Sequence, residues 1–238
     1  TRINLGSNHT ITETLDFIGG GRIVTGANTL TIAENATILG NTDQNYVQGN
    51  LQRYIAASLP VLFPVGDASN AATVTITPSV DSPGFVTVST TGGEYSEFGT
   101  SGLDPNSSVN RFWTISNQSL IFSVADIDFT WNAADVDPGA SQNNFIAARY
   151  NGSSWSLPST SLAQDGQLTA SNILEFGDFV IASTQVGQAG ASLNFDGNND
   201  EVQWGGNLVP NNNRPYSLSI WVKANGSANN RTILSQGN

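Results

Sequence analysis

Alternating oxygen-bearing side chains on a tight turn form the sharpest candidate site in this sequence. Asp196, Asn198 and Asp200 stand two residues apart, with a glycine between the first two. Ca²⁺ takes about six to eight oxygen ligands of this kind, so the pattern predicts a calcium site. The spacing is not that of an EF-hand, because Glu201 replaces that loop's glycine and Asn207 its bidentate glutamate. The alternative is a β-turn whose Asp and Asn side chains cap backbone amides.

Three tryptophans form a second candidate site. Trp131, Trp155 and Trp204 lie outside the strand motifs that contain the other two tryptophans, Trp113 and Trp221. Aromatic faces stack on pyranose rings, so these three indoles are predicted to form a glycan-binding platform. The alternative is that they pack in a core or between sheets, as most large aromatic side chains do.

The residues that catalysis requires are few. A Ser-His-Asp arrangement would need His9, the only histidine, which we expect at a surface turn. Asp126 and Asp128 share one face of a predicted strand. Their apolar neighbours indicate that they line the solvent side of that strand and do not form the carboxylate pair of a glycosidase. We therefore expect no catalytic residue and no enzyme activity in this chain.

The overall composition excludes several classes of protein. The 238 residues carry a net charge of −11 and contain no cysteine. A nucleic-acid-binding protein needs clustered Lys and Arg, which are scattered here. Without cysteine there are no disulfides and no zinc–thiolate sites. The most apolar stretch, 54–65, is interrupted by Pro60 and Pro64 and is too short to span a bilayer.

Polar and apolar residues alternate along much of the chain. Segments 73–77, 85–88 and 217–222 follow this period of two, which is typical of β-strands with one buried face. Gly, Pro and Asn pairs such as Asn151-Gly152 separate them as turns. No segment keeps a period of 3.6 residues, so the chain is predicted to be all-β.

The chain divides into four predicted parts. In residues 1–45 the pattern Arg2-Ile3-x-x-Gly6-x-Asn8 recurs 20 residues later, as in the stacked rungs of a β-solenoid. Two ordinary hairpins of similar composition are the alternative. Residues 46–184 have enough strands for a β-sandwich, and 185–190 form a small-residue linker. Residues 191–238 hold too few strands to close a core, so they are expected to be a truncated unit, completed by further residues or by another chain.

Two regions resemble modules of known families. Four segments between 46 and 183 resemble a β-sandwich module of very large secreted surface proteins of Bacteroidota: Tyr46–Arg53, Phe63–Gly66, Arg111–Ile115 and Phe176–Ala182. Ser192–Val202 and Tyr216–Lys223 resemble the opening strands of a laminin-G-like, or concanavalin A-like, jelly roll. The second resemblance implies that calcium is frequent in such domains. Both imply association with type 9 secretion, gliding adhesins or polysaccharide-degrading enzymes.

These features together indicate a mechanical and adhesive role. We expect a fragment of a secreted, extracellular or cell-surface bacterial protein that presents a glycan- or surface-binding module. Its expected partners are a glycan or cell-surface polymer and secretion or surface-assembly proteins, without nucleic acid and without a membrane span in this region. Ca²⁺ is the one expected cofactor. The alternatives are a non-catalytic carbohydrate-binding accessory of a polysaccharide-degrading enzyme, and cargo of a secretion system.

Overall fold

The described part of the molecule is built from β-strands. The structure is a computed structural model and describes residues 2–161, 163 and 166–185. Within these residues the only helices are short 3-10 turns: η1 (Phe98–Thr100), η2 (Ala133–Asp135) and η3 (Gln142–Asn144). None of them has the length and apolarity to cross a membrane. The prediction of an all-β fold is confirmed.

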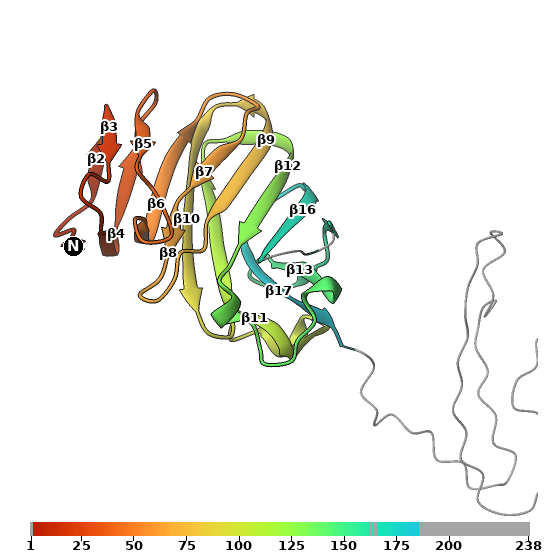
Figure 1. The fold of residues 1–238 in the computed structure, drawn as a ribbon. Helices are drawn as coiled ribbons and strands as arrows, with labels where there is room; N and C mark the ends of the chain where they lie inside the picture. Colours follow the sequence, from red (N-terminus) through yellow and green to blue (C-terminus); the bar gives the residue numbers. More distant parts are fainter. Residues whose placement is uncertain (1, 162, 164–165, 186–238) are drawn as a thin grey trace, which may run out of the picture. The chain divides into compact units, whose positions relative to one another are not determined.

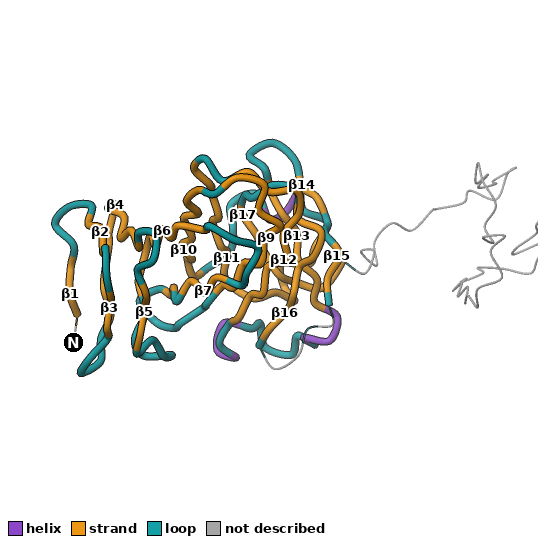
Figure 2. The backbone as a smooth tube through the Cα atoms, turned by 90° about the horizontal axis from the view of Figure 1, so that it is seen from above, coloured by secondary structure: helices purple, strands orange, loops and turns teal. Residues whose placement is uncertain are grey.

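The N-terminal strands stack as the rungs of a short β-solenoid. They are β1 (Arg2–Asn4), β2 (His9–Ile11), β3 (Thr14–Asp16), β4 (Arg22–Ile32) and β5 (Thr37–Leu39). The strand β1 pairs in parallel with β4, which places Arg2 opposite Arg22 and Ile3 opposite Ile23. On the opposite wall, β3 pairs in parallel with β5. The 20-residue offset of the sequence repeat therefore equals the offset between paired residues of β1 and β4. Figures 1 and 2 show these short strands stacked at the N-terminal end.

Asparagine side chains connect successive rungs at their corners. The side-chain amide of Asn28 donates to the Leu5 carbonyl at 3.1 Å, and that of Asn50 donates to the Asn28 carbonyl at 3.2 Å. In the other direction, Asn8 Oδ1 accepts a hydrogen bond from the Thr29 amide at 3.0 Å. These bonds satisfy backbone groups at corners where the regular ladder is interrupted.

The rungs continue into a larger sheet through β6 (Val47–Ile55). This strand pairs in parallel with β4 and antiparallel with β10 (Gly84–Gly92). The resulting ten-stranded sheet has the order β1-β4-β6-β10-β11-β17-β13-β14, with β2 beside β4 and β8 beside β6. Its remaining strands are β8 (Val65–Gly66), β11 (Leu103–Gln118), β13 (Phe145–Tyr150), β14 (Trp155–Ser156) and β17 (Asp178–Thr184).

A second sheet packs against the larger one to complete the sandwich (Figure 1). Its order is β15-β16-β12-β9-β7. The strands are β7 (Val61–Phe63), β9 (Val74–Ser82), β12 (Ile121–Thr130), β15 (Ser159–Thr160) and β16 (Gln167–Ile173). Inward side chains alternate with outward ones along each strand, as the sequence pattern predicts. In β12, for example, Ile127 and Phe129 are buried while Asp126 and Asp128 are exposed.

One apolar core runs through the rungs and the sandwich. Leu30 and Ile32 from β4 belong to the same buried cluster as Trp113, Phe129 and Ile181. The expected boundary near residue 45 therefore lies within a shared sheet and a shared core. The linker at 185–190 and the jelly-roll start at 191–238 lie, apart from Gln185, outside the described residues.

The four segments that resemble one family contribute strands to the same ten-stranded sheet. Tyr46–Arg53 leads into and forms β6, and the other three contribute β8, β11 and β17. The first two segments touch directly, because a Cβ atom added to Gly66 would lie 2.4 Å from the Tyr46 ring. The Tyr46 hydroxyl also donates to the Asp67 carbonyl at 2.9 Å. Only glycine fits at residue 66 beside that ring.

Candidate functional site

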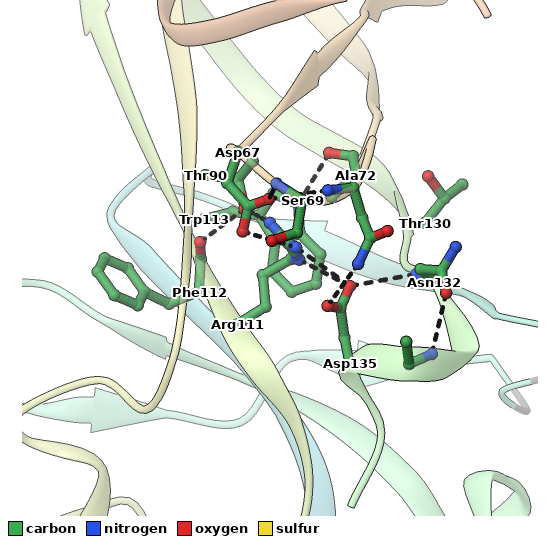
Figure 3. Close-up of polar contacts among 12 residues, drawn as sticks. Asp67, Ser69, Ala72, Thr90, Arg111, Phe112, Trp113, Thr130, Asn132 and Asp135 are labelled. Carbon is green, nitrogen blue, oxygen red and sulfur yellow. Dashed lines mark hydrogen bonds and ion pairs between the residues drawn. The ribbon is translucent and has the colours of Figure 1, made fainter. Parts of the chain in front are cut away.

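A buried arginine organises one end of the sandwich (Figure 3). The side chain of Arg111, on β11, is 0% exposed. Its Nη2 lies 3.0 Å from Asp67 Oδ2 and 3.1 Å from Asp135 Oδ2, while its Nη1 donates to Thr90 Oγ1 at 3.1 Å. A buried guanidinium is costly to desolvate unless its donors are satisfied, and here two carboxylates and a hydroxyl satisfy them.

Asp67 accepts hydrogen bonds from the backbone of loop 67–70 and also pairs with Arg111. Its Oδ1 accepts hydrogen bonds from the amides of Ser69, at 2.7 Å, and Asn70, at 2.9 Å. Burial acts to raise the pKa of Asp67, but these two amides and the Arg111 charge outweigh it, so the pKa lies below the ordinary 3.8. Asp67 is therefore held as a carboxylate at neutral pH.

Asp135 fixes a second loop to the same arginine. It completes a capping box on η2, in which Asn132 Oδ1 accepts from the Ala134 amide at 2.9 Å and Asp135 Oδ2 accepts from the Asn132 amide at 3.3 Å. Asp135 Oδ1 also accepts from the side-chain amide of Asn70 at 3.1 Å. The two loops, 67–70 and 132–135, are thereby held together through Arg111.

A polar groove lies beside this network. It has a volume of about 270 Å³, and most of its side chains are amides, hydroxyls or small groups. The residues that line it are Asp43, Gln44, Asn70, Ala71, Thr73, Thr130, Trp131, Asn132, Gly166 and Gln167. They come from four separate segments of the chain, which the fold brings to one end of the sandwich.

Several amides in the groove are free to bind a ligand. Asn132 and Gln167 are exposed, as is Gln44. Asn132 uses its Oδ1 on the Ala134 amide, and its Nδ2 has no hydrogen-bond partner among the residues that the structure describes. Within the described residues, the side-chain amides of Gln44 and Gln167 make no intramolecular hydrogen bond. Such groups donate to and accept from the hydroxyls of a neutral polar ligand.

The tryptophans predicted to form one platform lie in different places. Trp131 is 6% exposed, packs against Phe145 with a ring separation of 6.3 Å and donates from Nε1 to Gln142 Oε1 at 3.0 Å. It lines the groove but offers almost no ring face for stacking. Trp204 lies outside the described residues.

Trp155 belongs to a separate aromatic cluster beside η1. Its ring lies 5.0 Å from Tyr150 and 5.8 Å from Tyr95, and its Nε1 donates to Thr100 Oγ1 at 3.0 Å. Trp155 and Trp131 belong to different apolar clusters. The structure therefore does not bring these two indoles together.

The remaining candidate residues are exposed on strands or lie outside the described residues. His9 is exposed and begins β2. The carboxylates of Asp126 and Asp128 face solvent, where Asp128 Oδ1 accepts from Thr169 Oγ1 at 2.6 Å. Within the described ranges no three His, Cys, Asp or Glu side chains are grouped as for a metal ion. The predicted calcium ligands Asp196, Asn198 and Asp200 lie beyond those ranges.

Sequence reasoning missed the arginine network, although a signal was present. Val109, Arg111, Trp113 and Ile115 alternate along β11 and are all buried. A charged residue at an inward position of such a strand requires a buried partner of opposite charge. The groove gave no comparable signal, because its four segments are far apart in sequence.

The fold and the groove together define a class of molecule: stacked β-rungs continuous with a β-sandwich that carries a polar groove at one end. Comparisons with protein-family models, with curated proteins and with solved structures gave no match.

Proposed function

We propose that this chain is a non-catalytic, glycan-binding module of a secreted or cell-surface protein, with a structural and adhesive role. The observation that carries the proposal is the groove, where exposed amides converge on a site held rigid by the Arg111 network. Glycans present many hydroxyls, and amide side chains pair with hydroxyls as both donors and acceptors.

The continuous sheet supports the structural half of the proposal. Backbone hydrogen bonds connect the rungs to the sandwich without a break from β1 to β14. Such a sheet holds a binding groove on a stiff support, which suits a protein that anchors a polymer. The acidic composition, with a net charge of −11, suits a soluble extracellular surface.

A binding assay with single-residue variants tests the proposal. Neutral oligosaccharides that bind on a glycan array are titrated calorimetrically into the full chain and into variants Asn132→Ala and Gln167→Ala. Each variant removes one or two neutral hydrogen bonds, each contributing about 0.5–1.5 kcal/mol, so we expect affinity to fall roughly 3- to 10-fold or more.

The matched control is Gln118→Ala. Gln118 is exposed at the end of β11 that pairs near the start of β10, away from the groove residues. This variant is expected to bind as the unaltered chain does. Equal affinities in all three variants, or no glycan bound at all, would contradict the proposed function.

A further inference from the structure

We propose that a second hollow, lined by Arg2 and Arg22, binds an anionic group, and that the glycan recognised by this chain is therefore acidic. The inference rests on the proposed function and specifies its ligand class. The hollow has a volume of about 600 Å³. Its lining residues are Arg2, Gly19, Gly20, Gly21, Arg22, Gln44 and Asn45, none of which carries a negative charge.

The two arginines of the hollow differ from the other arginines in the described part of the chain. Arg111 and Arg149 are paired with carboxylates, and Arg53 donates to the Leu62 carbonyl inside the fold. Within the described residues, no carboxylate lies within 4.0 Å of Arg2 or Arg22. In a chain with a net charge of −11, this is a local positive site.

The register of the rungs places the backbones of Arg2 and Arg22 side by side, and both side chains line the hollow. Arg2 is the direct neighbour of Arg22 across the parallel pair β1 and β4. An anion bound in the hollow would gain charge-assisted contacts from both arginines.

Arg22 is held in place before any ligand binds. Its guanidinium lies 4.8 Å from the centre of the Tyr46 ring, and its Nη1 donates to the Ala68 carbonyl. The Gly21 amide donates to Asn45 Oδ1 at 2.7 Å, which ties the glycine loop to the loop 41–45. The absence of side chains on Gly19–Gly21 leaves the backbone accessible, so that a polymer can approach closely.

The hollow adjoins the amide-lined groove. Gln44 lines both, so the loop 41–45 separates one from the other. A chain that carries hydroxyls along its length and carboxylate or sulfate groups at intervals would contact amides in the groove and arginines in the hollow. A uronate-containing or sulfated polysaccharide has this chemistry.

Calorimetric titration with charged and neutral ligands of equal length tests the inference. Oligogalacturonate, a sulfated galactan oligosaccharide and a neutral galactan oligosaccharide are titrated into the full chain at low salt and at 0.5 M NaCl. We expect an acidic ligand to bind about tenfold or more tightly than the neutral one, with the difference reduced at high salt. The two acidic ligands distinguish carboxylate from sulfate as the recognised group.

The variant Arg2→Gln, combined with Arg22→Gln, is expected to abolish the preference, so that the acidic ligand binds no more tightly than the neutral one. Arg2→Lys with Arg22→Lys retains the charge and should keep part of the preference. Thermal unfolding of each variant shows whether the fold is intact, and Arg2→Gln alone, which removes an exposed side chain, provides a variant with little risk to folding.

The outcomes separate the inference from the proposed function. Neutral binding without an acidic preference, or a preference that survives the Gln variants, would contradict the anion site proposed in the hollow. Neither result would contradict the glycan site proposed in the groove. Binding of an acidic ligand that depends on Arg2 and Arg22 but not on Asn132 or Gln167 would support the anion site in the hollow. It would contradict the glycan site proposed in the groove. Failure of these three ligands and of every glycan on the array to bind would overturn both proposals.

Discussion

At the scale of single residues, the fold depends on how Arg111 is paired. The guanidinium is buried, and both of its carboxylate partners are largely buried, with side-chain exposures of 20% for Asp67 and 11% for Asp135. A further ion pair within the described residues, Arg149 with Glu175, differs because the Glu175 side chain is 70% exposed. Solvent screens an exposed pair and barely screens a buried one.

Substitution of these two pairs should therefore have unequal effects. Arg111→Met leaves two carboxylates without their cation, and we expect a loss of about 3–5 kcal/mol in the free energy of unfolding. Glu175→Gln should cost less than about 1 kcal/mol. Chemical denaturation followed by fluorescence measures both, and similar losses in the two variants would contradict the role assigned to Arg111.

The protonation of Asp67 predicts a dependence of stability on pH. The pKa of this carboxyl is lower in the folded chain than its ordinary value of 3.8. Its contribution is therefore fully present above that value and is lost as the pH falls through the folded pKa. The difference in unfolding free energy between the unaltered chain and Asp67→Asn should shrink between pH 6 and pH 3. A difference that stays constant over this range would contradict the assignment.

At the scale of elements, the rungs depend on close packing at their corners. Thr25 Oγ1 accepts a hydrogen bond from the Asn50 amide at 2.9 Å, and Thr25 is fully buried. A Cβ atom added to Gly49 would lie 2.2 Å from that oxygen. Gly49 thus lets β6 cross over Thr25 at the point where its register with β4 shifts.

Gly93 provides a matched control for this packing. Both glycines have positive φ, +111° at Gly49 and +104° at Gly93, but nothing lies within 4 Å of a Cβ atom added at Gly93. Alanine at either site incurs a similar backbone strain, so the difference between the variants reports the steric clash. We expect Gly49→Ala to be less stable than Gly93→Ala by about 1–3 kcal/mol. Equal thermal stabilities would show that the corner has room to adjust.

The elements also show what could be predicted from the sequence. The alternation in 73–77 and 85–88 indicated strands that the structure contains in β9 and β10. The offset between Arg2 and Arg22 indicated the parallel register. These features are local, or repeat at a fixed interval, so the sequence displays them directly.

The pairing of strands that are far apart in the chain could not be predicted from these local patterns. That β6 joins the rungs to the sandwich depends on β10, which begins about thirty residues later in the chain, and on a core filled from both sheets. The groove depends on the same long-range pairing, because Asp43, Thr73, Asn132 and Gln167 meet only after the strands have assembled. Burial of Trp131 likewise follows from packing against Phe145, which no local pattern shows.

At the scale of the whole described unit, the rungs and the sandwich form one body. They share the ten-stranded sheet and a single apolar core, and residues from both sides of the junction line the groove. We expect a module built this way to unfold cooperatively, because opening the rungs would expose the apolar core that they share with the sandwich. The groove would then stay assembled until the whole unit unfolds.

Native-state hydrogen exchange of the full chain tests this central claim most directly. The amides of β4, in the rungs, and of β12, in the sandwich, are followed at increasing denaturant by mass spectrometry. If the two regions form one body, their free energies of exchange converge on the same value and the same denaturant dependence. Exchange of β4 through a separate opening of much lower free energy, with β12 still protected, would show that the rungs are an independent unit.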